Sequence, residues 1–156
     1  MAIEKVRAYF RALGMDGRIN EYAESSATVE LAAHAAGCEP CRIAKTLSFL
    51  VDGAAVLVVA AGDARIANAK FKEALHAKAT MIPADQVEDL VGHAVGGVCP
   101  FAVNEGVRVF LDESLRRFDT VFPAAGSSNS SIELSIPELE RASRAEGWVD
   151  VCKGWE

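Results

Sequence analysis

Residues 43–61 have the sequence IAKTLSFLVDGAAVLVVAA, in which two apolar stretches flank Asp52-Gly53. The alternation in the first stretch and the Val-rich second stretch predict β-strands over Ile43–Val51 and Ala54–Ala61. An Asp-Gly pair between two such stretches is typical of a tight hairpin turn. We therefore expect a β-hairpin over residues 43–61.

Lys45 is the only charged residue of the first strand. Period-two alternation places its side chain on the more apolar face, together with Leu47 and Phe49. A lysine that faces a core must reach a polar cavity, pair with an anion or lose its proton. The alternative is a side chain that lies along the apolar surface and extends its amine to water. The pattern leaves both interpretations open.

A second motif, VGGVCPF at residues 95–101, predicts a rigid loop. The adjacent glycines allow backbone N–H groups to face a ligand at short range, and Pro100 stiffens the turn. Such donors can bind a carbonyl oxygen or a phosphate. A tight connection between a helix and a strand is the alternative. His93, beside this loop, is either a base or donor of such a site or a buried wall residue.

The remaining pattern predicts one mixed α/β domain over residues 1–156, because strands and helices do not alternate as in a doubly wound sheet. Ser135-Ile136-Pro137-Glu138 has the spacing of a helix capping box. Asp63 is expected to cap the next helix or to point into the site. Helices are predicted over residues 2–13, 29–36, 64–77, 85–91 and 136–145, and further strands over 19–22, 80–82, 107–111, 120–122, 132–134 and 148–151.

Composition excludes several classes of protein. The net charge of −6 argues against coating nucleic acid through bulk attraction, but it does not exclude a local basic face built from Arg65, Lys70, Lys72 and Lys78. No apolar run approaches a membrane span, and the first residues lack the pattern of a signal peptide, so we expect a cytoplasmic protein.

Cys38-Glu39-Pro40-Cys41 has the spacing of a redox or zinc motif. A redox pair normally opens a helix after a strand, whereas this pair follows a helix and enters a strand. A structural zinc site normally needs a second such pair. We therefore expect four reduced thiols, with no metal and no other cofactor.

Four motifs occur in order along the chain: Lys45-Thr46-Leu47, Gly62-Asp63, the 96–101 loop, and Gly126-Ser127-Ser128-Asn129 before Ile132-Glu133-Leu134. Together they resemble the YbaK/EbsC family of aminoacyl-tRNA deacylases, related to the editing domain inserted in bacterial prolyl-tRNA synthetases. The resemblance covers nearly the whole chain. It implies a mixed α/β fold in which helices surround a curved, barrel-like sheet.

The resemblance also implies hydrolysis of the ester that joins a wrong amino acid to the terminal adenosine of a tRNA. The expected substrate is a tRNA-Pro type carrying a small amino acid such as Cys, Ala, Ser or Thr, and a synthetase is a further expected partner. Lys45, Gly96 and Gly97 are the implied catalytic residues, since an activated ester needs positioning and oxyanion donors more than a protein nucleophile. The implied substrate-binding residues are Thr28, Thr46, Asp63, His93, Val98, Cys99, Pro100, Gly126, Ser127, Ser128 and Asn129.

Two other functions remain open from the sequence. The first is a non-catalytic module of the same fold that binds tRNA or a synthetase, because no obvious acid or base accompanies Lys45. The second is a redox or zinc protein built on Cys38 and Cys41. Binding without hydrolysis would favour the first, and metal analysis with thiol titration would decide the second.

Overall fold

The computed structural model describes residues 2–155. Within that range the chain forms five α-helices and ten short or medium strands, together with three 3-10 turns. The helices are α1 (Ala2–Ala12), α2 (Val29–Ala36), α3 (Asn68–Leu75), α4 (Ala84–Val91) and α5 (Ile136–Ser143). The strands are β1 (Ile19–Glu21), β2 (Ile43–Val51), β3 (Ala54–Ala61), β4 (Arg65–Ile66), β5 (Arg108–Asp112), β6 (Thr120–Pro123), β7 (Ser130–Ile132), β8 (Leu134–Ser135), β9 (Gly147–Val149) and β10 (Cys152–Lys153).

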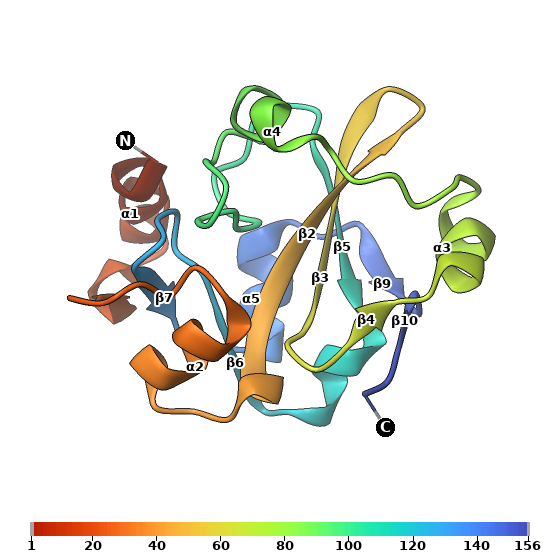
Figure 1. Cartoon of the computed structure of the whole chain (residues 1–156). Coiled ribbons are helices and arrows are strands. Elements are labelled where there is room, and N and C mark those ends of the chain that lie inside the picture. Colours follow the sequence, from red (N-terminus) through yellow and green to blue (C-terminus); the bar gives the residue numbers. More distant parts are fainter. Residues whose placement is uncertain (1, 156) are drawn as a thin grey trace.

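Six strands form the main sheet in the order β8-β6-β2-β3-β5-β9, with the predicted hairpin at its centre. The β2–β3 and β6–β8 pairs are antiparallel, whereas β2–β6, β3–β5 and β5–β9 are parallel. Figure 1 shows this twisted, curled sheet with α5 behind it, α1 and α2 on one side and α3 on the other. The predicted class, a mixed α/β fold with helices around a curved sheet, is confirmed.

The hairpin has the predicted bounds. Asp52 and Gly53 have φ angles of 51° and 79°. Positive φ at both central residues defines the turn type that Asp-Gly favours, because its twist matches that of the two strands. Every residue of β3 from Ala55 onward is buried, so the sheet is covered on both faces.

Several predicted element bounds are wrong, and long-range pairing explains most of them. The predicted helix over residues 64–77 begins only at Asn68, because Arg65–Ile66 pairs with Cys152–Lys153 instead. The predicted strand 132–134 is split, since Ile132 pairs with β1 whereas Leu134 pairs with β6. The predicted strand 80–82 is reduced to one bridge between Met81 and Phe49. The last two predicted elements, the helix over 136–145 and the strand over 148–151, are also shorter than predicted. Helix α5 ends at Ser143, and β9 covers Gly147–Val149.

The capping box of α5 is confirmed. The Ser135 hydroxyl accepts a hydrogen bond from the Glu138 backbone N–H, and the Glu138 carboxylate accepts one from the Ser135 N–H and pairs with Arg18. These hydrogen bonds, from Arg18 first, lower the pKa of Glu138 to about 2. A carboxyl pKa that is lower in the folded state stabilises the fold above the ordinary value and loses that effect as pH falls through about 2.

Ser135→Ala is expected to lower the free energy of unfolding at pH 7 by about 1 kcal/mol, because one N-terminal donor of α5 loses its acceptor. Glu138→Gln is expected to be destabilising at pH 7, and its difference from the wild type should shrink as the pH falls from the ordinary value of 4.5 towards 2. Urea unfolding at several pH values measures both effects. Glu88→Gln, on the exposed face of α4, serves as the control and should change stability little at any pH.

No helix within residues 2–155 is long and apolar enough to cross a membrane.

Candidate functional site

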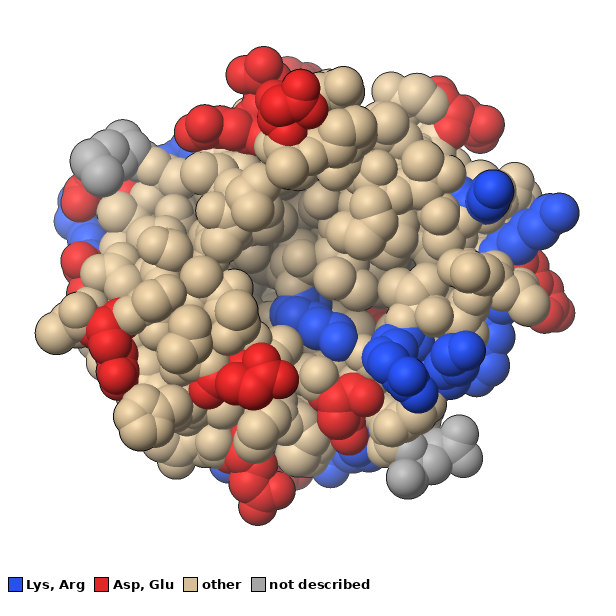
Figure 2. All heavy atoms as spheres, viewed as in Figure 1, with Lys and Arg blue, Asp and Glu red and all other residues tan. Residues whose placement is uncertain are grey.

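A cavity of about 420 Å³ opens between β2, the segment leading into α2, residues 81–87 and the loop at 95–98. Its mouth is the hollow near the centre of Figure 2. Small and medium apolar side chains form most of the lining, a composition typical of small-molecule sites. The polar residues of the lining are Ser26, Thr28, Lys45, Thr46, Ser48, Ser130 and Ser131.

Lys45 is the charged residue of this lining. Its side chain is partly buried, and its Nζ donates hydrogen bonds to the carbonyl oxygens of Gly62 (3.4 Å) and Ala64. Desolvation lowers the pKa of Lys45, while nearby Cys152 and Asp63 oppose part of that shift. The amine therefore sits at the cavity wall, held by main-chain acceptors rather than by a direct ion pair.

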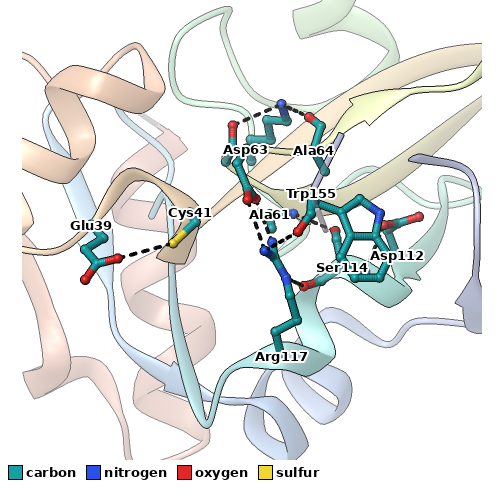
Figure 3. A network of polar contacts seen from close by, with 11 residues as sticks. Glu39, Cys41, Ala61, Asp63, Ala64, Asp112, Ser114, Arg117 and Trp155 are labelled. Carbon is teal, nitrogen blue, oxygen red and sulfur yellow. Dashed lines mark hydrogen bonds and ion pairs between the residues drawn. The ribbon is translucent and has the colours of Figure 1, made fainter. Parts of the chain in front are cut away.

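The turn that supplies those carbonyls is fixed by Arg117. This guanidinium binds both carboxylate oxygens of Asp63 at 2.6 and 3.0 Å, and it also donates to the main-chain oxygens of Ser114 and Trp155. Figure 3 shows Arg117 between Asp63 and Trp155. These hydrogen bonds lower the pKa of Asp63. Asp63 thus serves neither as the cap of the next helix nor as part of the cavity lining, and the predicted cap is wrong.

A buried carboxylate secures the other end of the same turn. Asp112 accepts hydrogen bonds from the backbone N–H groups of Ser114 (3.0 Å) and Val151 (2.9 Å), and the Ser114 hydroxyl accepts one from Ala61 N–H (3.1 Å). The chain from Ala61 to Ala64 is therefore held from both ends. We infer that this network determines where the Lys45 amine lies.

Arg117→Ala is expected to lower the free energy of unfolding by about 2 kcal/mol, because the Asp63 carboxylate and two main-chain carbonyls lose their charged hydrogen-bond donor. It should also raise the pKa of Lys45 towards its ordinary value, since the Asp63 carboxylate is no longer neutralised. Acetylation of Lys45 at limiting reagent over a range of pH, followed by mass spectrometry, measures that pKa. The control is Arg108→Ala, which removes a half-exposed pair with Glu146 and should leave Lys45 unchanged. An identical Lys45 titration in both variants would contradict the positioning role.

The glycine loop contributes Gly96 and Val98 to the cavity wall. Within residues 2–155 the backbone N–H groups of these two residues make no internal hydrogen bond. The Gly97 N–H donates to Ala94 O at 3.0 Å and is therefore not available, contrary to the prediction for this residue. Gly97 has a packing role instead, because a Cβ there would lie 2.8 Å from the Ser127 backbone.

The Gly126–Asn129 segment lies behind the glycine loop and ties it to the segment before α2. Asn129 O and Ser128 O accept hydrogen bonds from the N–H groups of Tyr22 (2.7 Å) and Ser26 (2.6 Å). The segment therefore supports two walls of the cavity without being part of its lining.

The structure thus divides the predicted site residues into two groups. Those that line the cavity are Thr28, Lys45, Thr46, Gly96 and Val98. Those outside the lining are Asp63, His93, Gly97, Cys99, Pro100, Gly126, Ser127, Ser128 and Asn129.

His93 lies in the packed layer behind the loop, not at the cavity surface. It is fully buried, its Nε2 lies 2.7 Å from Phe101 O, and burial lowers its pKa. Cys99 is equally buried beside it, and burial raises the pKa of its thiol to about 12. The structure therefore favours the wall interpretation of His93 and gives no support for a binding role of Cys99.

Two hydroxyl groups of the lining have no partner within residues 2–155: Ser26 Oγ and Thr46 Oγ1, both buried. Ser26 was not predicted as a site residue, because nothing local distinguishes it from the neighbouring Ser25. Its place in the cavity depends on the hydrogen bond from its N–H to Ser128, which lies about a hundred residues further along the chain.

The Cys38/Cys41 pair lies on the turn between α2 and β2. Burial raises the pKa of both thiols, the opposite of what a reactive thiolate requires. No group of three or more His, Cys, Asp or Glu side chains within residues 2–155 is arranged to hold a metal ion.

Comparison with known proteins identifies relatives of this chain. It is 46% identical over 157 residues to "Uncharacterized protein YwhH" of Bacillus subtilis (strain 168), and the match covers 100% of both chains. It is also 35% identical over 88 residues to "Proline--tRNA ligase" of Leuconostoc citreum (strain KM20), a match that covers 56% of this chain and 15% of the ligase.

A solved structure has the same fold over almost the whole length. The chain described as "Crystal structure of a putative trans-editing enzyme for prolyl tRNA synthetase" is 26% identical, with a TM-score of 0.88 and 98% of each chain covered. The family model described as "Aminoacyl-tRNA editing domain" matches residues 23–142, most of the sequence. The chain therefore belongs to the aminoacyl-tRNA editing domain family.

Proposed function

We propose that this protein is a deacylase that acts in trans and hydrolyses the ester of a mischarged tRNA. The proposed substrate is a tRNA of the tRNA-Pro type that carries a small amino acid such as Cys, Ala, Ser or Thr. The observation that carries the proposal is the meeting of the Lys45 ammonium and the Gly96 loop at one apolar cavity, in a chain of the editing family. The cavity has the volume of an ordinary small-molecule site, and a shaped pocket of this kind suits the sorting of small amino acids, which synthetases reject poorly by binding alone.

The proposed chemistry follows from what the lining offers. Water adds to the ester carbonyl, the bond from that carbon to the ribose oxygen breaks, and the proton of the water passes to the departing ribose oxygen. Lys45 holds a negatively polarised group of the substrate, and the free N–H groups of Gly96 and Val98 stabilise the developing oxyanion. An aminoacyl ester is reactive enough that positioning and charge stabilisation provide the required acceleration.

A second function is favoured by one observation. Within residues 2–155 no His, Cys, Asp or Glu side chain lines the cavity, so the wall contains no ordinary general base. A module that binds mischarged tRNA or a synthetase without hydrolysing the ester would need no general base. In the deacylase proposal, the neighbouring ribose hydroxyl of the substrate relays the proton: it accepts one from the attacking water and gives its own to the departing ribose oxygen.

Hydrolysis of a tRNA-Pro panel distinguishes these two functions. The panel carries Ala, Cys, Ser, Thr or the correct Pro, and loss of the labelled amino acid is followed over time. We expect at least one mischarged tRNA to be hydrolysed well above the buffer rate while the Pro ester is spared. Binding of a mischarged tRNA with no hydrolysis of any ester would overturn the deacylase proposal and favour the binding module.

A further inference from the structure

We propose that the two-stranded ribbon formed by β4 and β10 binds the phosphate backbone of the RNA stem that precedes the esterified 3′ end. The ribbon patch consists of Arg65 and Lys153 on the ribbon and Lys70 beside it. This inference rests on the proposed function, because it names the part of the RNA that this protein contacts outside the cavity.

The register of the ribbon places two positive charges opposite each other. Arg65 pairs with Lys153, whereas Ile66 pairs with the fully buried Cys152. Arg65 and Lys153 are therefore on the outer face, and both are exposed. Like charges directly opposite each other on adjacent strands are destabilising. A bound phosphate would remove that repulsion.

No carboxylate within residues 2–155 pairs with Arg65 or Lys153. Lys70 lies beside them, donating to Cys152 O and pairing with Asp150 at 3.1 Å. In a chain with a net charge of −6, two unpaired cations on one short ribbon form a local basic surface. Such a surface is suited to a polyanion.

Gly154 leaves space for the Arg65 guanidinium. A Cβ at residue 154 would lie 3.2 Å from Arg65 Nη2 and 3.3 Å from its Nε. The guanidinium therefore lies close to the main chain of Gly154, where no side chain occupies its place, and Arg65 is an exposed residue. A planar guanidinium held in this way can bind a phosphate through two parallel hydrogen bonds.

The ribbon patch begins where the cavity ends. Arg65 directly follows Ala64, whose carbonyl oxygen binds the Lys45 amine. Figure 2 shows positively charged side chains gathered beside the hollow, in the region where Figure 1 places β4 and β10. An RNA whose 3′ end enters the cavity thus has cations next to the opening. Its negatively charged phosphodiester chain is complementary to them.

The test uses an RNA hairpin with an unacylated 3′ CCA end and the full-length protein. Fluorescence anisotropy gives the dissociation constant at several salt concentrations. For Arg65→Ala/Lys153→Ala we expect weaker binding, and a slope of log affinity against log salt that is smaller by about 2, one for each lost phosphate contact. The control is Arg11→Ala, an exposed arginine of α1 on the other side of the molecule in Figure 1, which should leave the slope unchanged.

A charge reversal separates RNA binding from a structural role. Lys153→Glu places a carboxylate opposite Arg65, so the thermal midpoint should stay the same or rise while RNA binding weakens. A slope that is unchanged in the double variant, or a wild-type protein that does not bind the hairpin at low salt, would overturn the proposal.

A substrate that lacks the RNA stem distinguishes a failure of this proposal from a failure of the proposed function. The double variant should hydrolyse an aminoacylated CCA trinucleotide at the wild-type rate and full-length mischarged tRNA more slowly. Equal losses on both substrates would overturn the role of the ribbon patch. Hairpin binding that depends on Arg65 and Lys153, without hydrolysis of any ester by the wild type, would support the ribbon patch and refute the deacylase.

Discussion

Lys45→Met is expected to reduce kcat/KM for the preferred mischarged tRNA by about 10²- to 10³-fold, the effect typical of removing one donor that stabilises charge in a transition state. Methionine retains an unbranched apolar side chain, so the change removes the ammonium with little loss of packing. Single-turnover hydrolysis at saturating protein measures the chemical step separately from binding. Because Lys45 is proposed to hold a negatively polarised group of the reacting ester, the loss is expected mainly in that step.

The matched control for this variant is Lys5→Met. Like Lys45, Lys5 donates its amine to a main-chain carbonyl, that of Gly92 at 3.0 Å, but it is an exposed residue of α1. Its replacement should leave hydrolysis within about twofold of the wild type, as expected for a surface substitution. Near wild-type hydrolysis by Lys45→Met would remove the lysine from the proposed mechanism.

Gly62→Ala is expected to have the largest effect on stability, lowering the free energy of unfolding by about 3 kcal/mol. A Cβ at this position would lie 2.0 Å from Pro40 O and 2.8 Å from Val29 Cγ1. The first of these atoms belongs to the backbone, so the turn itself must move. Because the Gly62 and Ala64 carbonyls hold the Lys45 amine, hydrolysis should fall together with stability.

Gly147→Ala provides the control for that experiment. Gly147 lies on β9 with ordinary φ, and nothing lies within 4 Å of the position that its Cβ would take. Urea unfolding should show little change for this variant. A Gly62→Ala protein as stable as Gly147→Ala would mean that the 61–64 turn is not held as tightly as the structure indicates.

The parts of the fold that the sequence predicts are those that depend on neighbouring residues. The hairpin, the α2 bounds and the Ser135 capping box each depend on a pattern a few residues long, and all three are confirmed. The start of α3 is different. Residues 64–67 have a helix-like composition, yet Arg65–Ile66 pairs with β10, more than eighty residues further along the chain. No local pattern contains that information.

The same distinction applies to the candidate site. Alternation along β2 is sufficient to single out Lys45, and the two glycines single out their loop. The partner of Asp63 could not be predicted, because Arg117 lies 54 residues away. The inaccessible N–H of Gly97 depends on the detailed turn geometry around Ala94. The motifs that carried the resemblance therefore lead to segments that meet at the cavity, while several of the individual residues lie behind its lining.

The construction of the cavity has a consequence for how this fold can diversify. Its walls come from separate stretches of chain, and most of their side chains are alanine, valine, serine or threonine. The position of the Lys45 amine depends on a different set of contacts, those of the 61–64 turn and Arg117. Substrate preference can accordingly drift by single exchanges of methyl and hydroxyl groups in the walls, while the amine and its support stay in place.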